Sequence, residues 1–237
     1  MEIKFHGHSC FELSEGETTV LVDPFLKPNN PAAVHSGEEV EPTQIAISHG
    51  HADHMADAVP VAKRTGAHCV AIVELANWLE GQGVENVSDP NLGGTVEFDW
   101  GWIKLVPAWH TNTLPGSEEA PFSAEHGIVI GPAAGLVIEI GGKTVYHAGD
   151  TCLFSDMKLV AERNPIDVAL LPIGGHYTMD RHDAVVAAEF VGAATVLPMH
   201  YDTFPAVETD SGAFKSEVES RTASKVALPK PGEALTV

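Results

Sequence analysis

Four side chains of metal-binding type fall within six residues, in the sequence HGHADH that begins at His49. His49 and His51 are two positions apart, so in extended backbone their side chains point to the same side. Asp53 and His54 follow at the expected start of a helix and face back across the same opening. Imidazole and carboxylate groups together suit a divalent metal of borderline hardness. A chance histidine-rich loop is the alternative, but an apolar strand before the segment and a helix after it favour a metal site.

Three further candidate ligands lie far along the chain. His110, Asp150 and His200 each follow a short apolar segment that is typical of a strand. Strand ends on one rim of a sheet converge in space, which is how distant residues build one site. Each of the three alone would be interpreted as a solvated loop residue, but with the HGHADH segment they complete a set for two metals.

The order of these residues resembles that of the metallo-β-lactamase superfamily: HxHxDH, then a histidine, then an aspartate within Gly-Asp-Thr, then a last histidine. The likeness covers nearly the whole chain. Four short motifs are also similar to a subgroup of metal-dependent hydrolases grouped with ascorbate-6-phosphate lactonase-like proteins: Gly7-His8-Ser9, Asp23-Pro24, Ala148-Gly149-Asp150-Thr151 and Thr178-Met179-Asp180.

The resemblance implies both a fold and a metal site. The implied fold is α/β, an αββα four-layer sandwich with the site at one edge of its two sheets. Each candidate ligand receives a role: His49, His51 and His110 at a first metal, Asp53, His54 and His200 at a second, and Asp150 as a bridge between both. We expect two divalent ions, zinc in the first place, with manganese, iron or nickel as alternatives, because mixed imidazole and carboxylate sites accept all of them.

The expected reaction is hydrolysis. Two divalent cations about 4 Å apart can share one water and lower its pKa from about 16 to near neutrality. Attack by this hydroxide on a carbonyl or phosphoryl centre builds negative charge that the cations stabilise, and Asp53 or Asp150 would accept a proton as a catalytic residue. We therefore predict cleavage of a small ester, lactone or phosphodiester. A mononuclear-iron oxidoreductase of the same fold and a non-catalytic metal-dependent sensor stay open as alternatives.

Four other residues are candidates for substrate binding or for support of the ligands. The subgroup resemblance places His8 near the site, although a structural hydrogen bond explains it equally well. Asp23 would orient the histidine loop as a hydrogen-bond acceptor, or simply form an Asp-Pro turn. His176 lies in a glycine-rich loop that could line the substrate pocket, and Asp180 either lies beside it or caps the next helix. We expect the loop 111–125 to shape the pocket.

The elements that must position these residues alternate between strand and helix patterns. Strands are predicted over 3–5, 10–13, 19–22, 45–47, 70–73, 103–106, 136–140, 144–146, 168–171, 196–198 and 225–228. Helices are predicted over 56–64, 75–79, 184–191 and 215–220. No Ser/Gly-rich linker interrupts the pattern, which indicates one domain over 1–237 made of two half-repeats, about 1–130 and 131–237.

The net charge and the cysteine pattern indicate which class of partner and which cellular compartment to expect. The chain has 13 Lys and Arg against 33 Asp and Glu, a formal net charge of −20. An acidic surface repels phosphate backbones and anionic lipids, so we expect a small-molecule substrate and neither nucleic acid nor membrane as a partner. The 3 cysteines show no paired spacing, and the first residues do not resemble a signal peptide. We expect a cytoplasmic protein, with a homo-oligomer left open.

Two differences from other members of the superfamily argue against particular activities. Asp150 stands where secreted β-lactam-cleaving enzymes of this superfamily typically have a cysteine. Asp150 and His200 are only 50 positions apart, from 150 to 200, which leaves no room for the large extra domain of nucleic-acid-processing relatives. Neither antibiotic hydrolysis nor nucleic-acid processing is therefore expected as the main activity.

Overall fold

The structure is a computed structural model that describes residues 1–114 and 128–237. Its strands form two seven-stranded sheets. The first sheet has the order β14-β1-β2-β3-β4-β5-β6 and consists of β1 (Glu2–Gly7), β2 (Cys10–Glu15), β3 (Thr18–Val22), β4 (Gln44–Ala46), β5 (His68–Val70), β6 (Val87–Ser88) and β14 (Ala234–Thr236). The second has the order β13-β12-β11-β10-β9-β8-β7 and consists of β7 (Thr95–Phe98), β8 (Gly101–Pro107), β9 (Ala134–Ile140), β10 (Lys143–His147), β11 (Val168–Pro172), β12 (Thr195–Met199) and β13 (Lys225–Val226).

Each sheet begins as an antiparallel ladder and continues as a parallel one. In the first sheet β14, β1, β2 and β3 are antiparallel neighbours, and β3 to β6 are parallel. In the second sheet β7 to β10 are antiparallel, and β10 to β13 are parallel. Because parallel strands end at one edge of a sheet, the loops that follow them can bring distant side chains together there.

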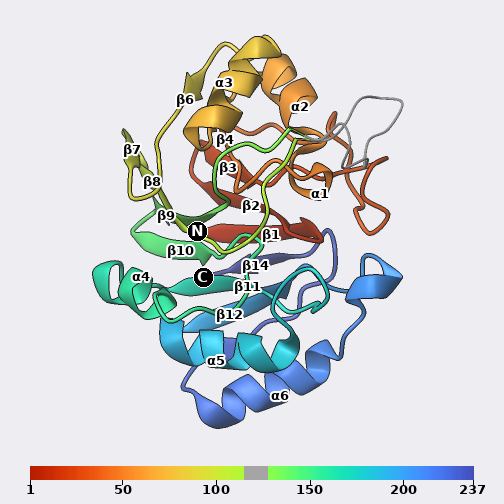
Figure 1. Cartoon of the computed structure of the whole chain (residues 1–237), viewed down its shortest axis with the longest axis vertical. Helices are drawn as coiled ribbons and strands as arrows, with labels where there is room; N and C mark the ends of the chain where they lie inside the picture. Colours follow the sequence, from red (N-terminus) through yellow and green to blue (C-terminus); the bar gives the residue numbers. More distant parts are fainter. Residues whose placement is uncertain (115–127) are drawn as a thin grey trace.

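The helices cover the outer faces of the two sheets. They are α1 (Ala52–Met55), α2 (Ala58–Thr65), α3 (Val73–Gly81), α4 (Met157–Arg163), α5 (Arg181–Val191) and α6 (Ser211–Arg221), with a 3-10 turn η1 (Pro205–Val207). Figure 1 shows α2 and α3 outside the first sheet and α4, α5 and α6 outside the second, with both sheets between them. The predicted αββα sandwich is confirmed. None of the helices in the described ranges has the length and apolarity needed to cross a membrane.

Local sequence explains why α5 begins and ends where it does. The Asp180 carboxylate accepts hydrogen bonds from the backbone N–H groups of His182 and Asp183, which satisfies donors that have no partner within the helix. Gly192 ends the helix in the left-handed conformation, with φ of 62°. The buried face of α5 packs on β11.

The core lies between the sheets and under the helices. All residues of β11 (Val168–Pro172) are buried, as expected for a parallel strand that is covered on both faces. Leu170 is fully buried in this strand, and its truncation to alanine would cost about 2–5 kcal/mol. This packed core holds the strand ends, and the loops that follow them, in fixed positions.

The expected elements differ from the structure in a few places. The strand predicted over 70–73 is wrong, since β5 ends at Val70 and α3 begins at Val73. The helix start expected at Asp53 and His54 lies in α1, whereas α4 and the strands β6, β7 and β14 were not predicted. The chain leaves the first sheet after β6 and enters the second at β7, well before residue 130. The division into two half-repeats near 130 stays a prediction.

Candidate metal centre

The HGHADH segment follows the end of a central parallel strand. β4 ends at Ala46, and α1 begins at Ala52, so the loop between them carries His49 and His51 at the edge of the sheet. Gly50 lies between the two histidines, where an added Cβ would approach the Ile130 Cδ1 atom to 2.7 Å. A residue without a side chain therefore lets the histidine loop pack closely against the segment that follows β8.

The first ligand group consists of three imidazoles. His49 Nε2 lies 3.0 Å from His51 Nδ1, and His110 Nε2 lies 3.3 Å from the same His51 atom. A tetrahedral zinc ion with Zn–N distances of about 2.0–2.1 Å places its ligand nitrogens about 3.3 Å apart. Two of the three nitrogen pairs are therefore close to the spacing that one zinc ion requires, and all three nitrogens lie within 4.8 Å of one another.

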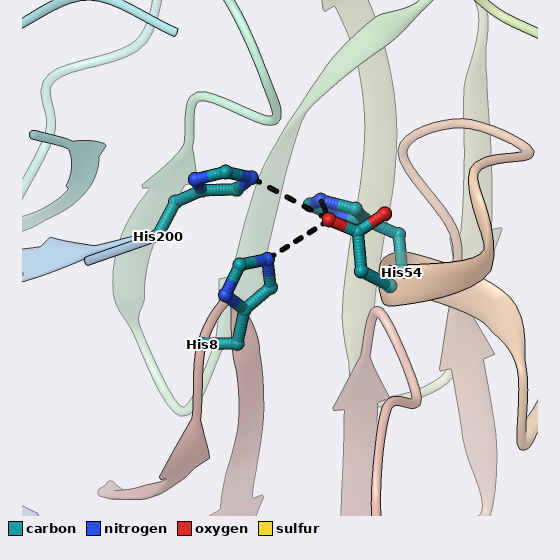
Figure 2. Close-up of side chains that lie close together, drawn as sticks. His8, His54 and His200 are labelled. Atoms are coloured by element: carbon teal, nitrogen blue, oxygen red, sulfur yellow. Dashed lines mark hydrogen bonds and ion pairs between the residues drawn. The ribbon is translucent and has the colours of Figure 1, made fainter. Parts of the chain in front are cut away.

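The second ligand group lies beside the first and contains His8, Asp53, His54 and His200. Figure 2 shows His8, His54 and His200 converging from different parts of the chain. The Asp53 Oδ2 atom lies 3.1 Å from His8 Nε2, 3.6 Å from His200 Nε2 and 4.0 Å from His54 Nε2. The group thus gathers four possible ligand atoms from the β1–β2 turn, α1 and the end of β12.

Asp150 lies between the two groups. Its Oδ1 atom is 3.2 Å from His54 Nε2, and its Oδ2 atom is 3.1 Å from His200 Nε2. Oδ2 is also 3.6 Å from His110 Nε2 and 3.9 Å from His49 Nε2. One carboxylate therefore faces both groups, which is the position required of a bridging ligand.

The buried atoms of this centre fit a cation. Within the described ranges, His54 Nε2 and Asp150 Oδ1 are buried and form no hydrogen bond of acceptable geometry. Buried polar atoms without partners are costly, and they are rare unless an ion or water satisfies them. The donor set of imidazole and carboxylate is also the one that zinc and related ions prefer.

Asp23 orients the candidate ligands through hydrogen bonds. Its Oδ2 atom accepts a hydrogen bond of 2.7 Å from His54 Nδ1 and one of 2.6 Å from the Ser48 hydroxyl. The Ser48 Oγ atom in turn lies 2.9 Å from His49 Nδ1. Asp23 is fully buried and therefore orients one imidazole of each group, directly for His54 and through Ser48 for His49.

Asn112 holds the first group together. Its Oδ1 atom accepts a 2.8 Å hydrogen bond from the Gly50 backbone N–H, and its Nδ2 donates to the Pro132 carbonyl at 3.0 Å. Asn112 follows His110 by two residues, so it joins the His49–His51 loop to the segment that carries His110. Ser48 and Asn112 were not singled out from the sequence, although each lies within two residues of a candidate ligand.

Burial and neighbouring charges shift the pKa values of the imidazoles of the centre in opposite directions. Burial lowers the pKa of His51 to about 4, with a further lowering by His110, and burial lowers the pKa of His49 well below the ordinary value. Burial also acts on His200 and His54, but Asp150 outweighs it and raises the pKa of His200 to about 9. Asp150 and Asp23 together raise the pKa of His54 well above its ordinary value.

The two carboxylates inside the centre stay ionised. Burial alone would raise the pKa of Asp150, but His200 and His54 hold it well below its ordinary value. Burial likewise opposes ionisation of Asp53, and hydrogen bonds with His200 and His8 outweigh it, so that its pKa is also lowered. Both groups are therefore charged and available as metal ligands near neutral pH.

Two of the sequence candidates stand apart from the ligand groups. His176 is exposed and its ring packs against Tyr177, and among the described residues it belongs to neither group. Asp180 uses its carboxylate to cap α5. Their loop still lies close to the centre, because a Cβ on Gly174 would approach the His200 carbonyl oxygen to 2.2 Å. Most of the loop 111–125, expected to shape the pocket, lies outside the described residues.

Comparison with known proteins identifies the family of this chain. The model of the β-lactamase superfamily domain matches residues 2–200. A UPF0173 metal-dependent hydrolase from Shouchella clausii is 43% identical over 220 residues, which cover 93% of this chain and 94% of that protein. One from Methanopyrus kandleri is 43% identical over 237 residues, 99% of each chain.

A solved structure extends the likeness to three dimensions. Igni18, a metallo hydrolase from the archaeon Ignicoccus hospitalis, is 34% identical and superposes with a TM-score of 0.86 over 99% of this chain and 97% of its own. Fold, ligand groups and relatives lead to one conclusion. This chain belongs to the UPF0173 family of metal-dependent hydrolases within the metallo-β-lactamase superfamily.

Proposed function

We propose that this hydrolase uses two metal ions, with zinc as the first choice, and cleaves a small ester, lactone or phosphodiester. The observation that carries the proposal is the position of Asp150: both of its carboxylate oxygens face the second ligand group, and Oδ2 also faces His110 and His49 of the first. His49, His51 and His110 would hold the first ion, and Asp53, His54 and His200 would hold the second. Similarity of four sequence motifs to lactonase-like proteins supports the inclusion of lactones.

Asp150 and Asp53 have different roles in the proposed reaction. When bound, two such ions supply Lewis acidity and a water of lowered pKa, so that hydroxide is present near neutral pH. Asp150 is 2% exposed and has both oxygens directed at histidines, which suits it to hold the centre together. The Asp53 side chain is 30% exposed and can reach solvent and substrate. We therefore assign the acceptance of a proton during turnover to Asp53.

The rest of the chain supports a small substrate in the cytoplasm. A net charge of −20 disfavours approach of nucleic acid or an anionic membrane. Cys10, Cys69 and Cys152 are all free thiols, which is typical of a reducing compartment. Neither a cysteine nor a serine is needed as a nucleophile if hydroxide attacks the substrate directly.

The test combines metal content with a substrate screen. Protein purified without added metal is analysed by mass spectrometry for metals and assayed with p-nitrophenyl esters, γ-lactones and bis-p-nitrophenyl phosphate. We expect about two metals per chain and hydrolysis that a chelator abolishes and added zinc restores. One iron per chain with oxygen consumption and no hydrolysis would contradict the proposal and favour the oxidoreductase alternative.

A pair of carboxylate variants makes the test specific. Asp150→Asn removes the carboxylate that faces both groups, and we expect it to lose at least one metal and nearly all hydrolysis while the fold survives. Asp183→Asn removes a carboxylate that is exposed on α5, and we expect two metals and normal turnover. Unchanged turnover in Asp150→Asn would refute the two-metal proposal.

A further inference from the structure

His8 is a buried member of the second ligand group, although it is not among the ligands that the family resemblance implies. It lies in the turn between β1 and β2, is 1% exposed, and has a φ of 59°, in the left-handed region that side chains other than glycine rarely adopt. Its carbonyl oxygen accepts a 2.9 Å hydrogen bond from the backbone N–H of His200. Backbone strain of this kind is concentrated at functional sites, and here it fixes an imidazole against the centre.

The Nε2 atom of His8 has the position of a metal ligand. It lies 3.1 Å from Asp53 Oδ2, close to the distance of about 3.3 Å between two ligand atoms on one tetrahedral zinc ion. The ligand atoms of His8, Asp53, His54 and His200 all lie within 4.8 Å of one another. In Figure 2 the His8 ring points into the space that His54 and His200 also face.

The other nitrogen of His8 has an oxygen partner of its own. His8 Nδ1 lies 2.9 Å from Thr203 Oγ1, and that hydroxyl donates a 3.3 Å hydrogen bond to the Tyr201 carbonyl oxygen. That hydroxyl can accept from Nδ1–H, and in this tautomer Nε2 has a lone pair for a cation. Without a cation, Nε2–H donates to Asp53 Oδ2 at 3.1 Å, so a bound cation would take the place of that hydrogen.

The same arrangement exists at His54, which is already an expected ligand. His54 Nδ1 donates to Asp23 at 2.7 Å, and Nε2 faces Asp150 at 3.2 Å. Metal-binding histidines characteristically donate their second N–H to an oxygen acceptor in this way. His8 therefore resembles His54 in being buried, in having an oxygen partner at Nδ1 and in facing a carboxylate with Nε2, although its Nδ1 partner is a hydroxyl and that of His54 is a carboxylate.

We propose that His8 binds the second metal through Nε2, so that this position has four side chains of its own beside the shared Asp150. The inference rests on the proposed two-metal function. Among the described residues, the first position has the three imidazoles of His49, His51 and His110 beside the same Asp150. With Asp150 counted at both, the second position would have one protein ligand more than the first. The second position is thus the more fully enclosed by protein and should hold its metal more tightly.

The experiment is a titration of metal-free protein with zinc, followed by calorimetry, in wild type and in His8 variants. His8→Asn suits the backbone, since asparagine tolerates the left-handed conformation, but its side chain is too short to reach Asp53. We expect one zinc equivalent to bind more than about 100-fold more weakly, beyond the roughly 10–100-fold typical of a residue that only supports a ligand. The other equivalent should bind as in wild type.

His8→Gln separates a ligand from a hydrogen-bond donor. The glutamine amide can still donate an N–H to Asp53, but it is a poor ligand for zinc. We expect the same loss as in His8→Asn, with a matching change in the absorption spectrum of the cobalt-loaded protein. Two tight equivalents in His8→Gln would overturn the inference, because His8 would then act only by holding Asp53.

Controls separate the inference from folding and from the proposed function. His68→Gln alters a half-buried imidazole that is bonded to Ser88, outside the centre, and should keep two tight equivalents. Circular dichroism checks that each variant is folded. If wild type binds two equivalents and His8→Asn binds them equally well, only the inference fails. If wild type itself binds fewer than two and hydrolyses no substrate, the proposed function fails and the inference is overturned with it.

Discussion

The two ligand groups of the centre are built in different ways. The first consists of imidazoles alone, and two of its members, His49 and His51, come from one short loop. The second combines a carboxylate with imidazoles and draws them from the β1–β2 turn, α1 and the end of β12. The HGHADH segment thus provides two members of each group, and the tertiary fold adds His110 to the first and His8 and His200 to the second.

Charge follows the same division. The pKa values of His49, His51 and His110 are all lowered, first by burial, so these imidazoles are neutral and ready to bind a metal. In the second group, burial is outweighed by carboxylates at His54 and His200, whose pKa values are raised, whereas burial and His200 lower the pKa of His8 to about 4. Because ligand histidines must be neutral, a metal entering the second group has to displace protons. The second group is therefore balanced internally without metal, whereas the first has little charge of its own.

The largest effect should come from removing an imidazole of the first group. His110→Ala would leave two imidazoles there, and we expect at least about a 10³-fold loss of kcat/KM, because a bound metal supplies several kcal/mol of charge stabilisation. One tight metal should remain, in the second group. Metal analysis by mass spectrometry and steady-state kinetics measure both effects. Loss of both metals in His110→Ala would show that the two groups do not bind independently.

A smaller effect is expected on the pH dependence of stability in the metal-free protein. His200 has its pKa raised from 6.5 to about 9, with burial outweighed by Asp150, so its stabilisation is complete below pH 6.5 and is lost as pH rises towards 9. His51 has its pKa lowered from 6.5 to about 4 by burial and His110, so its stabilisation is complete above 6.5 and is lost as pH falls towards 4. The free energy of unfolding should therefore be greatest near pH 6.5. It should fall by on the order of a few kcal/mol towards acid pH, the acid limb, and by a similar amount towards alkaline pH, the alkaline limb.

Urea unfolding of the metal-free protein between pH 4 and pH 9 measures these limbs. His200→Asn should flatten the alkaline limb, and its backbone is tolerated because His200 already has a positive φ of 54°. His51→Asn should flatten the acid limb and leave the alkaline one. If each variant changed the opposite limb, the assignment of protonated and neutral imidazoles to the two groups would be wrong.

The local character of the HGHADH segment explains how much of the centre could be predicted from the sequence. The HGHADH segment shows its chemistry directly, and His110, Asp150 and His200 could be found because each follows a recognisable strand. The relation of His8 to Asp53 was out of reach, since it depends on a turn 45 residues away in sequence. Ser48 and Asn112 carry polar side chains that are common in loops, and only their contacts distinguish them.

The secondary structure, too, could be predicted from the sequence only in part. The long apolar strands of the second sheet, such as β9 and β11, were predicted because burial on both faces leaves a continuous apolar run. The apolar run 70–73 is divided between the end of β5 and the start of α3, and hydrophobicity alone cannot locate that boundary. β14 is a strand of 3 residues that exists through its pairing with β1, which is a tertiary contact.

The smallest expected effects come from two supporting residues, one for each group. Asn112→Ala removes the acceptor of the Gly50 N–H and should weaken only the first zinc equivalent. Thr203→Val removes the partner of His8 Nδ1 and should weaken only the second. Roughly 10–100-fold is expected in each case, the usual effect of losing a group that orients a ligand. Thr203→Ser keeps the hydroxyl and should restore wild-type affinity.

The paired measurement tests the comparison more strictly than either variant alone. Zinc titration of each single variant and of the double variant gives two affinities per protein. If the groups are independent, the double variant should show the sum of the two single effects in free energy, each on its own equivalent. If Asn112→Ala also weakened the second equivalent, the groups would be coupled, and Asp23 and Asp150 would be the connections, since each contacts ligands of both groups or their supports.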